Sequence, residues 1–188
     1  IFFKNLIQQI NDEQICQDRQ EMLSFLYMIS SISKHHRRFD NFFFKIENLL
    51  LEYKKEICNF FTAEKLFSIF KSNKRILLFL IEQKMLKINQ SIADVMIKKY
   101  NKYEYKKYFF PEIKNFLSNE EKNQENEIDE KTFEENRKNG ENDSHICKLI
   151  RNDLIDDFIR YVNSTNFPLT STIETSIFET NSLLNKKL

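Results

Sequence analysis

The sequence predicts an all-α fold of stacked helix pairs, and three observations lead to that prediction. The chain of 188 residues contains one Gly and two Pro, and because turns favour these two residues, their scarcity argues for helices joined by short polar turns. Apolar residues recur three and four positions apart through most of the chain, which is the spacing of an amphipathic helix. A run of six apolar residues, 76–81, would need cover on more than one side, as in a stacked array.

That run lies inside residues 71–86, KSNKRILLFLIEQKML. Ser72 and Asn73 form a turn signal, and the apolar pattern continues on the N-terminal side of this turn. We therefore predict two short helices, over residues 63–71 and 74–86, folded against each other. Thr62 is placed to cap the first of them.

A longer apolar stripe precedes this pair, over about residues 39–61. Its members step by three or four positions, which predicts one amphipathic helix. They are Phe39, Phe43, Ile46, Leu50, Tyr53, Ile57 and Phe61.

The flanking stretches also carry helix signals. Residues 1–34 predict one or two amphipathic helices, interrupted near residues 11–12 or 17–18. Ser91 and Asp94 match a capping box that would open another helix after the central pair.

Residues 98–110, KKYNKYEYKKYFF, interleave lysine with tyrosine. Proteins that bind nucleic acid combine basic and aromatic residues in this way. The other interpretation is a helix or helix–loop with its rings packed inward and its lysines in water. We favour the second, because the further features of a nucleic-acid module are missing from the sequence. Pro111 then precedes a short predicted helix that carries Ile113, Phe116 and Leu117.

Residues 119–143 differ from the rest of the chain in composition. They hold ten acidic and four basic residues, a net charge of −6. Such a segment cannot bury enough apolar surface to order itself, so we predict an acidic linker, mobile or loosely helical. It would join a helical N-terminal domain, residues 1–118, to a helix pair over residues 144–188. The linker could dock on a basic face near residues 98–107, but we favour a solvated link.

Residues 144–162 repeat the apolar pattern of the central pair. A shift of 79 positions aligns six residues of each segment, which indicates a degenerate repeat architecture. The aligned pairs are Phe67 with Ile146, Phe70 with Leu149, Asn73 with Asn152, Ile76 with Ile155, Phe79 with Phe158, and Leu80 with Ile159. Asn at both turns fits the left-handed conformation that this residue tolerates.

Three strings resemble a region that precedes the repeats in ankyrin-repeat proteins of trichomonad protists, a domain of unknown function that is itself ankyrin-like. They are RKNGENDSHICKLIRNDLIDDFIRYVNSTNFPL, HHRRFDNFFFKIENLLLEYKKEI and IFKSNKRILLFLIEQK. The resemblance implies an ankyrin-like α-solenoid with degenerate repeats, a protein-binding role and no catalytic residues. The TPLH signature and the turn Gly of ordinary ankyrin repeats are missing, so we expect helix pairs joined by plain loops rather than β-hairpin fingers.

We therefore expect a protein–protein interaction module without catalysis, whose partners are an unidentified protein and downstream ankyrin repeats of the same chain. Apolar residues crowd the C-terminal end, and a repeat array needs a polar cap or a following repeat there. The chain begins with Ile1 and has no signal-peptide pattern, so we expect a piece of a longer, intracellular and cytoplasmic protein. No apolar run is long enough to span a membrane.

The alternative function is electrostatic binding of nucleic acid or acidic membrane by two basic stretches, although a net charge of +1 gives no overall attraction. The candidate surface residues are His35, His36, Arg37, Arg38, Lys98, Lys99, Lys102, Lys106 and Lys107.

No cofactor, metal or small-molecule substrate is expected. The three cysteines and three histidines lack the spacing of a zinc site. Cys58 and Cys147 lie in apolar helical patterns and are predicted as core residues. Cys147 and His145 are two positions apart, so they would not face each other on a helix as a nucleophile and base.

Overall fold

The computed structural model describes residues 8, 10, 17–35, 40–99, 105–118, 130–139, 144–168, 170–171 and 177–178. These residues form helices and turns and contain no strand, so the predicted all-α class is confirmed for this part of the chain. The chain divides into two compact units, Ile1–Lys98 and Lys99–Leu188, and each is described by itself.

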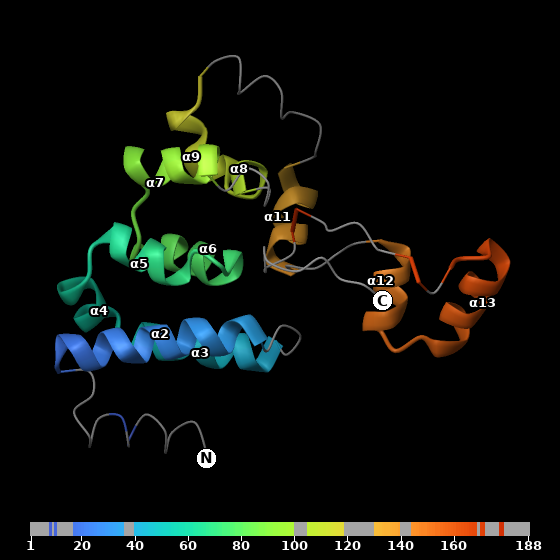
Figure 1. The fold of residues 1–188 in the computed structure, drawn as a ribbon, viewed down its shortest axis with the longest axis horizontal. Coiled ribbons are helices and arrows are strands. Elements are labelled where there is room, and N and C mark those ends of the chain that lie inside the picture. The colour runs from blue at the N-terminus through green and yellow to red at the C-terminus, as the bar shows by residue number, and fades with distance from the viewer. Residues whose placement is uncertain are drawn as a thin grey trace. The chain divides into compact units, whose positions relative to one another are not determined.

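The first unit is a succession of short helices (Figure 1). They are α2 (Arg19–His35), α3 (Asp40–Glu52), α4 (Lys54–Phe60), α5 (Ala63–Phe70), α6 (Lys74–Glu82), α7 (Gln90–Asp94) and the π-helix η1 (Val95–Lys99). The predicted interruption at residues 17–18 is present, since Asp18 accepts hydrogen bonds from the amides of Gln20 (2.7 Å) and Glu21 (3.0 Å) at the start of α2.

The stripe predicted as one helix over residues 39–61 is divided into α3 and α4. The break is at Tyr53, whose φ of −102° and ψ of 20° leave the helical range. The hydrogen-bond ladder nevertheless continues, because Tyr53 N–H donates to Leu49 (3.3 Å) and Ile57 N–H donates to Tyr53 (2.9 Å). The stripe therefore stays on one face, and its described members are all buried: Phe43, Ile46, Leu50, Tyr53, Ile57 and Phe61. Phe39 lies outside the described residues.

The predicted pair of central helices is confirmed in α5 and α6. The Thr62 side chain caps α5 by accepting from the Lys65 amide at 3.3 Å. The C-terminal end of α6 differs from the prediction, since the helix stops at Glu82 rather than at residue 86. Lys84 takes a left-handed φ of 57°, and the amides of residues 85 and 86 turn back to the Leu80 carbonyl at 2.9 and 3.0 Å. This closing turn satisfies a terminal carbonyl and ends the helix.

Asn73 joins this pair to α2. Its Oδ1 caps α6 by accepting from the Ile76 amide at 3.1 Å, while its Nδ2 donates to the Ser33 carbonyl at 3.4 Å. Asn73 is buried, so both partners would lose a hydrogen bond away from water if the amide were removed.

We expect Asn73→Ala to lower the free energy of unfolding by about 2 kcal/mol, since cap loss and an unsatisfied buried group each cost on the order of 1 kcal/mol or more. Asn59 on α4 is exposed, so Asn59→Ala is the matched control. Urea midpoints of the two variants measure the difference. Coinciding midpoints would show that Asn73 has no such role.

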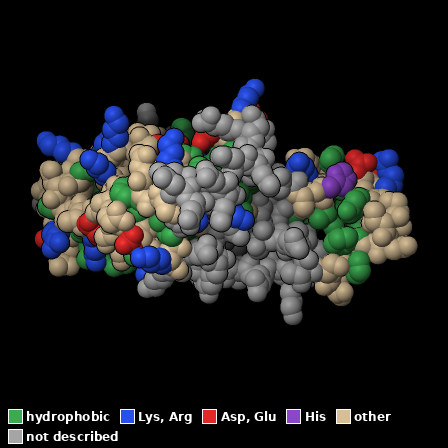
Figure 2. Space-filling view, turned by 90° about the horizontal axis from the view of Figure 1, so that it is seen from above, with side chains coloured by type: hydrophobic (Ala, Val, Ile, Leu, Met, Phe, Trp, Pro, Cys, Tyr) green, Lys and Arg blue, Asp and Glu red, His purple; other side chains and the backbone are tan. Residues whose placement is uncertain are grey.

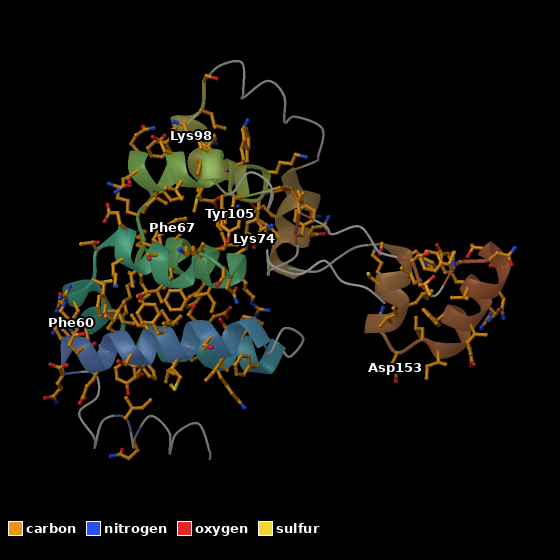
Figure 3. All side chains as sticks on the ribbon, in the orientation of Figure 1. Phe60, Phe67, Lys74, Lys98, Tyr105 and Asp153 are labelled. Atoms are coloured by element: carbon orange, nitrogen blue, oxygen red, sulfur yellow. The ribbon has the colours of Figure 1, made fainter. Side chains whose placement is uncertain are left out.

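Further contacts fix the layers of the first unit. Ser30 Oγ on α2 donates to the Ile69 carbonyl of α5 at 2.7 Å. Arg75 on α6 pairs with Glu47 of α3 at 3.2 Å and lies 4.6 Å from the centroid of the Phe43 ring. In Figure 3, side chains fill the space between α2 and α3 on one side and α5 and α6 on the other. Most apolar residues of α5 and α6 are therefore covered by neighbours, although Phe79 and Ile81 are half-buried.

The cap of α7 differs from the predicted box at Ser91 and Asp94. Asn89 is the cap, and its Oδ1 accepts from the Ile92 amide at 3.0 Å. Asn89 Nδ2 also donates to the carboxylate of Glu64 on α5. Asn89 can therefore bind both helices, whereas Ser91 is exposed.

The second unit contains α8 (Tyr105–Tyr108), α9 (Phe110–Ile113), the 3₁₀ turn η3 (Lys114–Phe116), α11 (Glu130–Asn139), α12 (His145–Arg151) and α13 (Ile155–Thr165). Its N-terminal limit is Lys99. Within this unit, α8 and α9 hold α11 by side-chain contacts, as described below.

The acidic linker predicted over residues 119–143, mobile or loosely helical and in the favoured interpretation solvated, is described at residues 130–139. These residues form α11, and Arg137 of this helix is buried. The described part of the acidic segment is therefore helical and docked rather than solvated. Composition misled the prediction because the contact depends on a buried cation rather than on apolar area.

The predicted helix–turn–helix over residues 144–162 is present as α12 and α13. Its turn differs from that of α5–α6, however. Asn73 is extended, with a φ of −131°, and Asn152 has a φ of −85°, so neither asparagine is left-handed. Asp153 is left-handed instead, with a φ of 54°, in the turn labelled in Figure 3. The helix predicted after Ser171 falls largely on residues outside those described.

Candidate interaction surfaces

The first predicted basic stretch lies mostly outside the described residues. His35 is the last residue of α2, but its side chain is not among those described, and His36, Arg37 and Arg38 lie outside the described residues. This half of the basic surface therefore stays a prediction.

The lysines of the second stretch are divided between the two units. Lys98 is exposed on η1 and pairs with Asp94 at 3.9 Å, while Lys106 is half-buried and Lys107 exposed on α8 of the second unit. Lys99 ends η1 with its side chain undescribed, and Lys102 lies outside the described residues. Lys98 and the Lys106–Lys107 pair therefore belong to different units, and a common basic surface stays a prediction.

Three aromatic residues of the same stretch are core residues, whereas Phe110 is half-buried and Tyr100 and Tyr103 lie outside the described residues. Tyr105, Tyr108 and Phe109 are each 0% exposed. The ring of Phe109 lies 5.5 Å from that of Tyr105 and 4.8 Å from that of Tyr108, measured between centroids. Bases stack only on rings that they can reach, so this geometry favours the interpretation in which rings pack inward and lysines face water.

The described cysteines are free thiols. Cys147 is half-buried, whereas Cys58 is exposed, so the prediction that Cys58 is a core residue is wrong: it lies on the outer side of α4, away from buried Ile57. His145 packs its ring 4.9 Å from that of Tyr161. Within the described ranges, no group of three metal-ligating side chains occurs.

An apolar surface is exposed on the α12–α13 pair. Ile155 is 60% exposed and Ile159 is 50% exposed, and residues four apart share one face of a helix. Ile150 and Leu154 are exposed beside the turn. Figure 2, seen from above, shows that hydrophobic side chains also gather at the end of this pair away from the turn with Asp153, which Figure 3 labels. We call Ile150, Leu154, Ile155 and Ile159 the α13 face.

The aligned residues of α6 are in the opposite environment. Ile76 and Leu80, which match Ile155 and Ile159 in the sequence repeat, are both 0% exposed. The same apolar pattern is therefore covered in one helix pair and open in the other. The sequence predicted the pattern but not this difference, because exposure depends on which neighbours are present.

A polar cluster holds α11 against α8 and α9, and sequence reasoning did not find it. Arg137 donates from Nη1 and Nη2 to the two carboxylate oxygens of Glu112, both at 2.8 Å. Arg137 Nη1 also donates to the Tyr108 carbonyl at 3.2 Å, and Tyr108 Oη donates to the Arg137 carbonyl at 3.4 Å. A sequence signal exists in hindsight: Phe133 and Arg137 stand four apart, on one face of a helix.

Burial and mutual attraction shift the pKa values of Glu112 and Arg137 in this cluster. Burial raises the pKa of the Glu112 carboxyl, although the hydrogen bonds and charge of Arg137 oppose the shift. The pKa of Arg137 is raised, because the attraction of Glu112 and Glu134 exceeds the effect of its burial. The geometry is that of a salt bridge, with Arg137 Nη2 2.8 Å from Glu112 Oε1.

Among the described residues, no helix is both long enough and apolar enough to cross a membrane. No protein-family model matches the chain, and no curated protein and no solved structure matches it either. The resemblance to ankyrin-repeat proteins accordingly stays a prediction from the sequence.

Proposed function

We propose that the chain is a non-catalytic protein-interaction module of ankyrin-like helix pairs, and that the α13 face binds an amphipathic helix pair of another repeat or protein. The observation that carries the proposal is the exposure of Ile155 and Ile159. Singly exposed apolar residues are common, but adjacent ones on one helix face are typical of an interaction site.

The nature of the occupant follows from the first unit. There the aligned residues of α6 are buried among neighbouring helices, and Arg75 contacts Glu47 and the Phe43 ring of α3. A helix pair of similar design would cover the α13 face in the same way. Electrostatic binding of nucleic acid or membrane receives less support, because the rings of residues 105, 108 and 109 are buried.

The test compares two double variants of the 188-residue chain. Ile155→Lys with Ile159→Lys changes the α13 face, and Asn163→Lys with Ser164→Lys adds the same charge at exposed polar positions of α13. Both variants should have a thermal midpoint close to that of the unaltered chain, because substitutions at exposed positions usually change the free energy of unfolding by about 0.5 kcal/mol or less. Each isoleucine contributes about 1.5–3 kcal/mol when fully buried, so the face variant should bind a partner at least about tenfold more weakly.

Affinity purification is done with the unaltered chain and with each double variant. It selects proteins that the Ile155→Lys, Ile159→Lys variant fails to retain and the other two chains retain. Direct titration of those purified proteins against the three chains then measures binding. A partner whose affinity falls only with the face variant supports the proposal. Equal affinities for all three chains would show that the α13 face is not the binding surface.

A further inference from the structure

The Arg137 cluster has the composition of a recognition site for a guanidinium group. The α8–α9 side supplies a carboxylate fork from Glu112, a main-chain carbonyl from Tyr108, and the Tyr108 ring, whose centroid lies 5.9 Å from Arg137 Cζ. Arginine binds a carboxylate through two parallel hydrogen bonds, whereas the ammonium of lysine is a point donor. We call Glu112 and Tyr108 the cradle.

The helix that fills the cradle is held by few groups. Of the side chains described on α11, only Arg137 is buried. Phe133, Glu134 and Asn136 are half-buried, while Lys131 and Glu135 are exposed. Phe133 lies against the Arg137 guanidinium at 5.6 Å and against the Phe178 ring at 5.5 Å. The side of α11 that meets the cradle is therefore centred on one arginine and one ring.

A helix of this kind depends on its contact for its order. Isolated helices shorter than about 12–15 residues are marginal in water, and α11 spans 10 residues. Burying both members of an ion pair also costs solvation, which offsets much of their attraction. Within the described chain, Arg137 Nε is buried without a hydrogen-bond partner, so the fit of α11 to the cradle is incomplete.

From these observations we propose that the cradle is an arginine-recognition site, that α11 is its internal and displaceable occupant, and that a partner segment with an aromatic residue four positions before an arginine competes for it. The aromatic residue takes the place of Phe133 and the arginine that of Arg137. This site lies on α8–α9 and is independent of the α13 face.

The test empties the cradle in the full chain with Arg137→Ala. The probe is an acetylated and amidated peptide of Glu130–Asn139, and a second peptide carries Arg137→Lys. We expect the arginine peptide to bind this chain at least tenfold more tightly than the lysine peptide by calorimetry. Adding Glu112→Gln to the chain should remove the preference. A chain with Lys131→Ala, changed at an exposed position of α11, should bind the arginine peptide as weakly as the unaltered chain does, because α11 still fills the cradle.

Equal binding of the two peptides, or no binding by a folded Arg137→Ala chain, would overturn the proposal. If circular dichroism shows that this variant does not fold, hydrogen exchange on the unaltered chain decides instead. Excess arginine peptide should then speed exchange of the α11 amides at least tenfold more than excess lysine peptide does. Exchange of α11 that both peptides leave unchanged would show that the helix is a fixed part of the fold.

Discussion

Leu80→Asp is expected to unfold most of the first unit. Leu80 lies on α6 and is 0% exposed, and even truncation of such a leucine to alanine costs about 2–5 kcal/mol. The aspartate adds the penalty of a carboxylate placed among apolar neighbours. We expect a loss of at least about 4 kcal/mol, which is comparable to the total stability of a marginal domain.

Glu82→Ala is the control, because Glu82 ends the same helix and is exposed. It should change the free energy of unfolding by about 0.5 kcal/mol or less. Urea denaturation followed by circular dichroism compares the two variants. If both have the midpoint of the unaltered chain, α6 is not the buried centre of the unit.

Phe109→Ala is expected to lower the free energy of unfolding of the second unit by about 3–5 kcal/mol, the usual range for truncation of a buried phenylalanine to alanine. Phe109 is 0% exposed and packs its ring against those of Tyr105 and Tyr108. Its loss would leave a cavity among rings that support the cradle. A thermal melt followed by near-ultraviolet circular dichroism reports on the packing of the seven tyrosines of the chain, these two among them.

Lys114→Ala is the matched control for this prediction, since Lys114 is exposed a few positions along the same segment. It should leave the melt unchanged. The comparison also separates the two interpretations of the lysine–tyrosine stretch. An exposed stacking platform would tolerate Phe109→Ala in the absence of nucleic acid, so an unchanged melt would favour the nucleic-acid interpretation.

The sequence by itself determined the helical class and the local ends of several helices. The spacing of apolar residues by three and four positions correctly predicted the buried faces of α3, α4, α5 and α6. Thr62 was also correctly predicted as the cap of α5. These features depend on residues close together in the chain, so a local pattern contains the information. Asn89 rather than the predicted Ser91 caps α7, and Asn89 also donates to Glu64 of α5, a contact that is not local.

Only the tertiary structure decided which apolar and charged groups are covered. Ile76 and Ile155 occupy aligned positions, yet one is 0% and the other 60% exposed, because burial is a property of the neighbours. Arg137 lies in a segment whose composition predicts solvation, yet it is buried against a carboxylate 25 residues away. A charged side chain is buried only when a partner compensates its charge. The position of that partner in the fold cannot be predicted from a local sequence pattern.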